Sequence, residues 1–310
     1  MTLPRLSRRH ALIAGAALPF AGAFAPQPAR AAAGMLGRTT PQFNRTALGG
    51  FEVTALLAGT RTFPEPGKIF GLNTDPADFA AVSAANFIPT DKAQFFFTPT
   101  VVNTGTELVL FDTGLAGEGI TVALAAAGYT PDQIDVVVLT HMHGDHIGGL
   151  MTAGAPTFAN ARYVSGSVEH NYWAGAANEG FDANVKPLND KMTFLEPGGT
   201  VASGITAMAA FGHSPGHMAY MLESNGAQLA LLADTANHYV WSLAYPDWEV
   251  RFDADKTAAA NTRRALLGML AADKLPFIGY HMPFPAMGYV DIRDDGFRYV
   301  PVSYQMMMEG

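Results

Sequence analysis

The sequence predicts an α/β protein in which two β-sheets stack face to face between outer helices, an αββα sandwich. Short apolar runs of strand length occur in two series along the chain, and each series is followed by segments with helical periodicity. Hydrophobic residues make up 49% of the 310 residues and charged residues 15%, which is typical of a globular protein. We therefore expect one large domain over residues 32–310, preceded by a targeting segment at residues 1–31.

The first series of strands ends at residue 139. Its four expected strands are residues 51–63, 95–103, 107–111 and 134–139. The turn sequence Thr104-Gly105-Thr106 joins the second and third strands as a hairpin, and only Asp135 interrupts the apolar run of the fourth. Residues 32–46 are expected to be a flexible lead-in, and residues 64–91 a long loop with short helical turns.

The second series of strands and the helices complete the sandwich. Strands are expected at residues 161–164, 205–211, 217–223, 228–232 and 277–280, with a closing hairpin within residues 289–300. Helices are expected at residues 119–128, 168–174, 184–192 and 255–273. The last helix is the clearest, because Ala259, Leu267 and Leu270 recur on one side of it.

The first 31 residues have the features of an export signal. Ser7-Arg8-Arg9-His10 precedes an apolar run over residues 11–24, and Ala29-Arg30-Ala31 offers a cleavage site. This arrangement resembles a twin-arginine signal, which implies a periplasmic or secreted protein that is exported already folded. The alternative is an uncleaved membrane anchor, but the apolar run is shorter than the roughly 20 residues that span a bilayer. No stable membrane insertion is therefore expected.

Charge and cysteine content narrow the partners and ligands. The signal contains four arginines and no acid, so removing it from a chain with 19 basic and 27 acidic residues leaves a net charge of −12. An acidic surface repels nucleic acid, so we expect a small-molecule substrate and no nucleic-acid partner; a homodimer stays open. Because the chain has no cysteine, every metal ligand must be His, Asp or Glu.

A cluster of ligand-type side chains follows the strand that ends at residue 139. His141, His143, Asp145 and His146 lie within six residues, at the point where a buried strand meets a turn. Imidazole and carboxylate groups are the ligands that zinc and similar divalent ions take in proteins. The alternative is a polar surface loop that happens to be rich in histidine, but nine histidines in the chain make such a cluster improbable by chance.

Three further ligand-type residues stand where later strands end. Gly212-His213-Ser214-Pro215-Gly216-His217 follows one strand, Asp234 ends an apolar run, and His281 ends the short strand over residues 277–280. Asp112 stands in the same way at the tip of an earlier strand. The candidate metal ligands are therefore His141, His143, Asp145, His146, His213, Asp234 and His281.

Taken together, these motifs resemble the metallo-β-lactamase superfamily of binuclear metallohydrolases. The shared features are H-x-H-x-D-H, G-H-x-x-G-H, a strand-end Asp and a strand-end His, spread over nearly the whole domain. The resemblance implies one metal held by His141, His143 and His213, and a second held by Asp145, His146 and His281, with Asp234 bridging. It implies two divalent ions, zinc first, with manganese, cobalt or iron as alternatives. Asp112 and His217 are expected to orient ligands rather than to bind metal.

The C-terminal region is similar to methyl parathion hydrolase and dihydrocoumarin-lactonase-type enzymes. The similarity lies in His281-Met282-Pro283-Phe284-Pro285-Ala286-Met287-Gly288 and in Gly296-Phe297-Arg298-Tyr299-Val300. It implies that Trp173 helps line the substrate pocket, although Trp173 is equally compatible with a place in the core. Ala233 departs from the usual Gly before the bridging Asp, and polar Asn237 and His238 stand near an apolar position of the phosphotriesterases. The second departure, at Asn237 and His238, favours a lactone or ester over an organophosphate.

The expected chemistry follows from the ligands. Two metals that share a hydroxide lower the pKa of water, and the hydroxide attacks a carbonyl or phosphoryl centre of a lactone, aryl ester or phosphotriester. Asp145 is the expected catalytic residue, because its carboxylate can shuttle the proton. The alternatives are an acyl-homoserine lactonase, a non-catalytic metal-binding protein on the same fold and an oxygen-reducing diiron protein. The last lacks a visible flavin motif.

Overall fold

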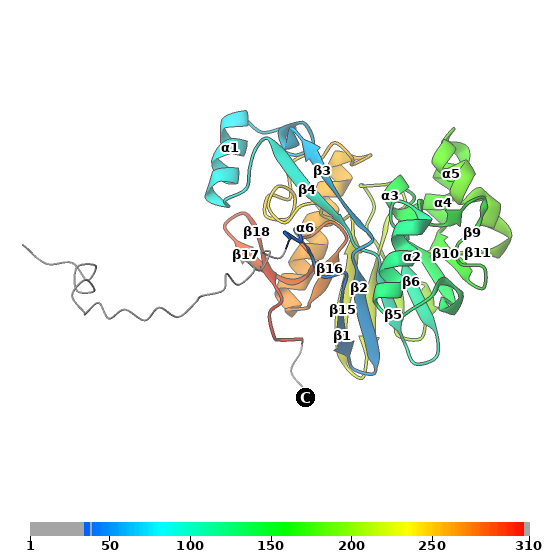
Figure 1. The fold of residues 1–310 in the computed structure, drawn as a ribbon. Coiled ribbons are helices and arrows are strands. Elements are labelled where there is room, and N and C mark those ends of the chain that lie inside the picture. The colour runs from blue at the N-terminus through cyan, green and yellow to red at the C-terminus, as the bar shows by residue number, and fades with distance from the viewer. Residues whose placement is uncertain (1–33, 38, 307–310) are drawn as a thin grey trace, which may run out of the picture. The chain divides into compact units, whose positions relative to one another are not determined.

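The computed structural model describes residues 34–37 and 39–306. The chain divides into two units, Met1–Thr40 and Pro41–Gly310, and the fold described below is that of the second unit. The expected export signal at residues 1–31 lies outside the described residues. The predicted αββα sandwich is confirmed (Figure 1).

The first sheet has seven strands in the order β1-β2-β5-β6-β7-β10-β11. Their bounds are Phe43–Leu48, Phe51–Leu56, Thr100–Asn103, Leu108–Phe111, Val136–Leu139, Arg162–Gly166 and Met192–Leu195. Strands β1, β2, β5 and β6 pair antiparallel, and β6, β7, β10 and β11 pair parallel. Because the carboxyl ends of the parallel strands share one edge, the loops after β6 and β7 lie side by side.

The second sheet also has seven strands, which follow the chain from β12 to β18. Their bounds are Thr200–Ala202, Ile205–Ala209, Met218–Ser224, Ala227–Ala233, Phe277–Gly279, Met287–Arg293 and Gly296–Pro301. Only β15 and β16 pair parallel in this sheet, which again places two strand ends at one edge. Two small sheets complete the strands: β3 with β4 (Gly59–Pro64 and Lys92–Phe97), and β8 with β9 (Met151–Thr152 and Ala155–Pro156).

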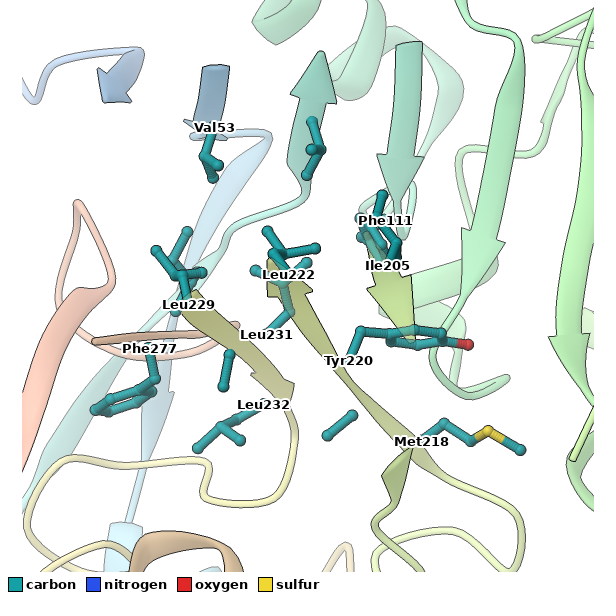
Figure 2. Packing of buried hydrophobic residues seen from close by; sticks show 14 of the residues in the cluster. Val53, Phe111, Ile205, Met218, Tyr220, Leu222, Leu229, Leu231, Leu232 and Phe277 are labelled. Atoms are coloured by element: carbon teal, nitrogen blue, oxygen red, sulfur yellow. The ribbon is translucent and has the colours of Figure 1, made fainter. Parts of the chain in front are cut away.

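The main core lies between the two large sheets. Alternate residues of β7 point to opposite faces, as the strand period requires. Val136 and Val138 join the inter-sheet core, whereas Val137 and Leu139 pack with helix α2 (Gly117–Ala126) on the outer face. Figure 2 shows the inner residues of the second sheet, among them Tyr220, packed toward the first.

Helices cover the outer faces of both sheets. Leu124 of α2 packs on the first sheet, and Leu267 and Leu270 of α6 pack on the second. The α-helices α1 to α6 span Pro76–Ala85, Gly117–Ala126, Gly144–Ile147, Ser167–Gly175, Glu179–Asn184 and Lys256–Asp273. Short 3-10 helices span Pro66–Lys68, Pro131–Gln133 and Lys186–Lys191. No helix in the described part of the chain is long and apolar enough to cross a membrane.

Several element boundaries differ from the sequence prediction. The expected lead-in contains most of β1, and residues 51–63 form two strands, β2 and β3, which belong to different sheets. Residues 95–103 likewise divide between β4 and β5, around Thr98 and Pro99. The expected loop over residues 64–91 contains the ten-residue helix α1, and residues 184–192 are mainly 3-10 helix. Strands β11 and β12 were not predicted.

Helix α6 begins with a side-chain cap whose removal tests this account of the fold. Asp255 Oδ1 accepts a hydrogen bond of 2.9 Å from the Ala258 backbone N–H. We expect Asp255→Ala to lower the free energy of unfolding by about 1 kcal/mol, because the N–H loses its partner. The measurement is urea denaturation, with Asp182→Ala as the control, since that variant breaks only an exposed ion pair with Lys186. Equal losses in both variants would contradict the cap.

Candidate metal centre

The seven candidate ligands meet at one edge of the sandwich. His141 follows β7, His213 lies in the loop after β13, Asp234 follows β15 and His281 stands two residues after β16. Asp145 and His146 lie in the short helix α3, which continues from the turn after β7. Each residue therefore comes from a strand end or from the turn next to it.

Three imidazole nitrogens converge in a first group. His143 Nδ1 lies 3.0 Å from His141 Nε2 and 3.0 Å from His213 Nε2. The rings meet nearly edge to face, so the three nitrogens point at a common position. This is a ligand set that can hold one metal ion.

A second group combines two imidazoles with a carboxylate. Asp145 Oδ2 lies 3.3 Å from His281 Nε2 and 3.6 Å from His146 Nε2. These three atoms also lie close enough together to hold one ion.

Asp234 lies between the two groups. Its Oδ2 is 3.2 Å from His213 Nε2 on one side and 3.2 Å from His281 Nε2 on the other. Its Oδ1 is 3.3 Å from His146 Nε2. Ala233, the residue before it, has φ 43°, a left-handed conformation that favours glycine, which gives a physical reason for the Gly usual at this position.

Hydrogen bonds behind the cluster orient the imidazole rings. His146 Nδ1 donates to Asp112 Oδ2 at 2.8 Å, His213 Nδ1 to Asp253 Oδ1 at 2.9 Å, and His281 Nδ1 to the Phe96 carbonyl at 2.8 Å. A neutral imidazole that donates through Nδ1 keeps its lone pair on Nε2. In all three residues the outward bond therefore leaves Nε2 free to bind a metal ion.

The buried carboxylates in and behind the cluster make it favour positive charge. Burial lowers the pKa of His281, but Asp234 and Asp145 outweigh it and raise the pKa to about 10. Burial also lowers the pKa of His213, but Asp234 and Asp253 outweigh it and raise the pKa to about 9. At Asp145, burial raises the pKa, but His146 and His281 bring it down to about 2. The acids are thus ionised at neutral pH and attract cations.

Two buried atoms in the cluster have no hydrogen-bond partner in the part of the chain that the structure describes. They are His146 Nε2 and Asp234 Oδ1, and both face the other ligand-type atoms. Buried polar atoms without a partner are costly, and a divalent cation between them would satisfy both. The donor set of imidazole nitrogens and carboxylate oxygens fits such an ion.

Asp112 and His217 both lie behind the ligands. Asp112 accepts hydrogen bonds from Thr140 as well as from His146. His217 Nδ1 donates to the Ala210 carbonyl, and its Nε2 accepts from the backbone N–H of Asp234. Both side chains are therefore placed to hold ligand-bearing segments in position.

Sequence reasoning missed a buried ion pair behind His213. Asp253 joins His213 to Arg263 of α6, with its Oδ2 2.8 Å from the Arg263 guanidinium. Both side chains are fully enclosed. Nothing in the sequence pairs Asp253 with a histidine 40 residues away, so only the folded chain reveals this contact.

An aromatic cavity of about 390 Å³ opens above the cluster. Its floor contains ligand residues, and its wall consists of Arg61, Phe63, Phe95, Phe97, Leu115 and Phe252. The four phenylalanines come from β3, β4 and the segment before α6, and the sequence pattern did not single them out. Trp173 is not among the residues of this wall; it packs edge-on against His143, with ring centroids 5.7 Å apart.

Comparison with known proteins decides the family. A profile of the metallo-beta-lactamase superfamily matches residues 98–276, more than half of the chain. The chain belongs to the metallo-beta-lactamase superfamily. The matched region includes six of the seven candidate ligands of this superfamily member, and His281 follows just beyond it.

Individual relatives of this superfamily member are distant. Lactamase-like protein nscB of Neosartorya fischeri is 33% identical over 129 residues, which cover 41% of this chain and 34% of the relative. N-acyl homoserine lactonase of Bacillus cereus is 29% identical over 119 residues, 38% of this chain and 45% of the relative. The matches thus span less than half of either relative's length. The solved structure of AidC, a dizinc quorum-quenching lactonase, is 25% identical, with a TM-score of 0.78 over 85% of this chain and 98% of AidC.

The position of Asp234 between the two groups leads to a direct test. We expect Asp234→Ala to lose most of its bound metal, because both groups lose a carboxylate oxygen at once. The measurement is metal content per chain after dialysis, by atomic emission. Asp247→Ala serves as the control, since Asp247 carries an exposed ion pair with Arg264 outside the cluster. If Asp234→Ala retains two ions, the bridging role of Asp234 is contradicted.

Proposed function

We propose that this protein is a binuclear metal-dependent hydrolase that cleaves lactones and aryl esters. The observation that carries the proposal is the position of Asp234, between two groups of ligand-type side chains on the floor of an apolar cavity. Asp234 would bridge the ion held by His141, His143 and His213 and the ion held by Asp145, His146 and His281.

The cavity wall favours a neutral substrate with an apolar or aromatic body. Phe95 and Phe97 are nearly fully buried, and their rings pack edge to face against the His281 ring. Arg61 carries the only positive side chain among the wall residues, and its guanidinium lies 4.9 Å from the centre of the Phe63 ring. Such a wall excludes water and leaves few polar groups to recognise a highly charged substrate.

Divalent ions, when bound, would polarise the substrate carbonyl and lower the pKa of an attacking water molecule. The protein supplies the orientation and a proton acceptor. Asp145 lines the cavity, and its Oδ2 faces His146 and His281, so Oδ1 is the atom left to accept a proton. His146 and His281 lower the pKa of Asp145 against the effect of burial, which keeps the carboxylate ionised. An ionised carboxylate has only acceptor oxygens, so Oδ1 can take up a proton.

Polar side chains near the bridge support a carbonyl substrate over a phosphotriester. Asn237 Nδ2 donates to Asp234 Oδ2 at 2.9 Å, and the buried His238 ring stacks on Trp241. Both residues stand near a position that is apolar in the phosphotriesterases. Within the resemblance to methyl parathion hydrolase and dihydrocoumarin-lactonase-type enzymes, their polarity favours a lactone or ester over an organophosphate. Export through residues 1–31 would place the enzyme outside the cytoplasm.

A second candidate substrate is an acyl-homoserine lactone. The structural similarity to AidC, a quorum-quenching lactonase, supports it. The aromatic wall instead supports a compact aryl lactone. Chain length separates the two, because a dedicated acyl-homoserine lactonase gains binding energy from each added methylene of the acyl chain.

A substrate panel tests the proposal. We expect the zinc-loaded protein without residues 1–31 to hydrolyse dihydrocoumarin faster than N-butyryl- and N-decanoyl-homoserine lactones, and these faster than methyl paraoxon. The measurement is kcat/KM for each substrate, with metal content determined on the same sample. Preference for the decanoyl lactone would select the second candidate. No turnover of any of them with two ions bound would contradict both.

Replacement of the proposed proton acceptor tests the mechanism. We expect Asp145→Asn to lower kcat by about 10²-fold or more, because the amide cannot accept a proton. The ion held by His141, His143 and His213 should stay bound, since Asp145 belongs to the other group of ligand atoms. The readouts are kcat and metal content, with Asp132→Asn in an exposed turn as the control. Wild-type kcat in Asp145→Asn would exclude the acceptor role.

A further inference from the structure

Glu169 is a fully buried carboxylate that the proposed mechanism does not use. It lies in the first turn of α4, behind His143 and His213, and its exposed fraction is 0%. Its two oxygens accept hydrogen bonds from four donors: the backbone N–H groups of Met142 and Gly216, the Ser214 hydroxyl and the Trp173 indole N–H. None of these donors is a cation, so hydrogen bonds to neutral groups satisfy both buried oxygens.

The donors belong to the two loops that carry the first group of ligands. Met142 stands between His141 and His143, and its N–H is 2.9 Å from Glu169 Oε1. On the other loop, the Ser214 hydroxyl lies 2.6 Å from Oε1 and the Gly216 N–H 2.8 Å from Oε2. One carboxylate therefore joins the loop of His141 and His143 to the loop of His213.

The second loop is shaped to approach α4 closely. A Cβ atom placed on Gly216 would lie 2.1 Å from the backbone nitrogen of Glu169, so no larger residue fits there. A second contact also joins the two loops: the Met218 backbone N–H donates a hydrogen bond of 3.0 Å to the Thr140 carbonyl. The contact with Glu169 is thus part of a close-packed junction.

We infer that Glu169 is a positioning residue that sets the spacing of the three imidazoles in the first group. The inference rests on the proposed binding of metal by His141, His143 and His213. Each loop is held at the residue next to a ligand, so a shift of either loop would change the 3.0 Å separations among the three nitrogens. Preorganised ligands bind metal more tightly because less ordering accompanies binding.

The same carboxylate fixes Trp173. The Trp173 indole N–H donates to Glu169 Oε1 at 2.6 Å, and the ring stands edge-on to His143. Trp173 therefore acts with Glu169 as a support for His143.

Four variants test the inference. Glu169→Ala removes all four acceptor contacts. Glu169→Gln keeps one acceptor oxygen but turns an amide N–H toward a donor, so it should rescue part of the effect. Ser214→Ala removes one donor, and Ser83→Ala is its matched control, because Ser83 is an equally buried hydroxyl hydrogen-bonded to Trp241 and Phe79 away from the ligand loops.

Two measurements are made on each variant. The first is hydrogen exchange of the metal-free protein in residues 140–146 and 212–218. The second is titration with cobalt(II), in which the absorption spectrum separates two binding steps. For Glu169→Ala we expect faster exchange in both loops and a first-group affinity about 10- to 100-fold lower, with the second step changed by no more than about threefold. Glu169→Gln and Ser214→Ala should fall between it and Ser83→Ala, which should match the wild type.

The outcomes separate this inference from the proposed function. Wild-type exchange in the two loops of Glu169→Ala would overturn it, as would equal weakening of both cobalt steps or equal effects in Ser83→Ala. A wild-type protein that binds no metal would contradict the proposed function, and the exchange result would still decide whether Glu169 holds the loops.

Discussion

The buried Asp234 carboxylate is the feature on which the rest of the site depends. Its two oxygens face His213, His281 and His146 within 3.3 Å, at the edge where both large sheets end. A buried charge without compensation costs several kcal/mol, so the site needs positive charge around it. Against the effect of burial, Asp234 raises the pKa values of His213 and His281, which favours their positively charged forms, and a pair of divalent cations would supply positive charge in the same place. Burial, charge and ligand geometry therefore point to the same chemistry.

A small number of hydrogen-bond acceptors in the surrounding fold hold the ligands in position. Asp112 after β6, the Phe96 carbonyl of β4, Asp253 before α6 and Glu169 of α4 each fix a different ligand or ligand loop. Because these acceptors come from both layers and from the small β3–β4 sheet, the cluster forms only when the sandwich is complete. The same β3–β4 sheet supplies much of the aromatic wall, so substrate contact and ligand orientation share one element.

The sequence predicted the sandwich fold. It also indicated all seven ligand candidates, because each stands at or just after the end of an apolar run and several fall into closely spaced motifs. It could not predict the residues that hold the ligands in position. Glu169 and Asp253 are single acids without a motif. The partners of Glu169 lie 27 to 47 residues away, apart from Trp173 on the same helix, and the ligand residue that Asp253 orients, His213, lies 40 residues away. Strand limits were missed where an apolar stretch passes from one sheet to another, as at residues 51–63, since hydrophobic periodicity does not report such a change. The sequence left Trp173 open between pocket and core, because aromatic residues suit both equally.

Anomalous X-ray diffraction from zinc-loaded crystals, recorded on both sides of the zinc edge, tests the central claim most directly. The account predicts two peaks about 3.5–4 Å apart. One should lie at His141, His143 and His213, the other at Asp145, His146 and His281, with an Asp234 oxygen bound to both. A single peak, or two peaks with Asp234 bound to neither, would contradict it.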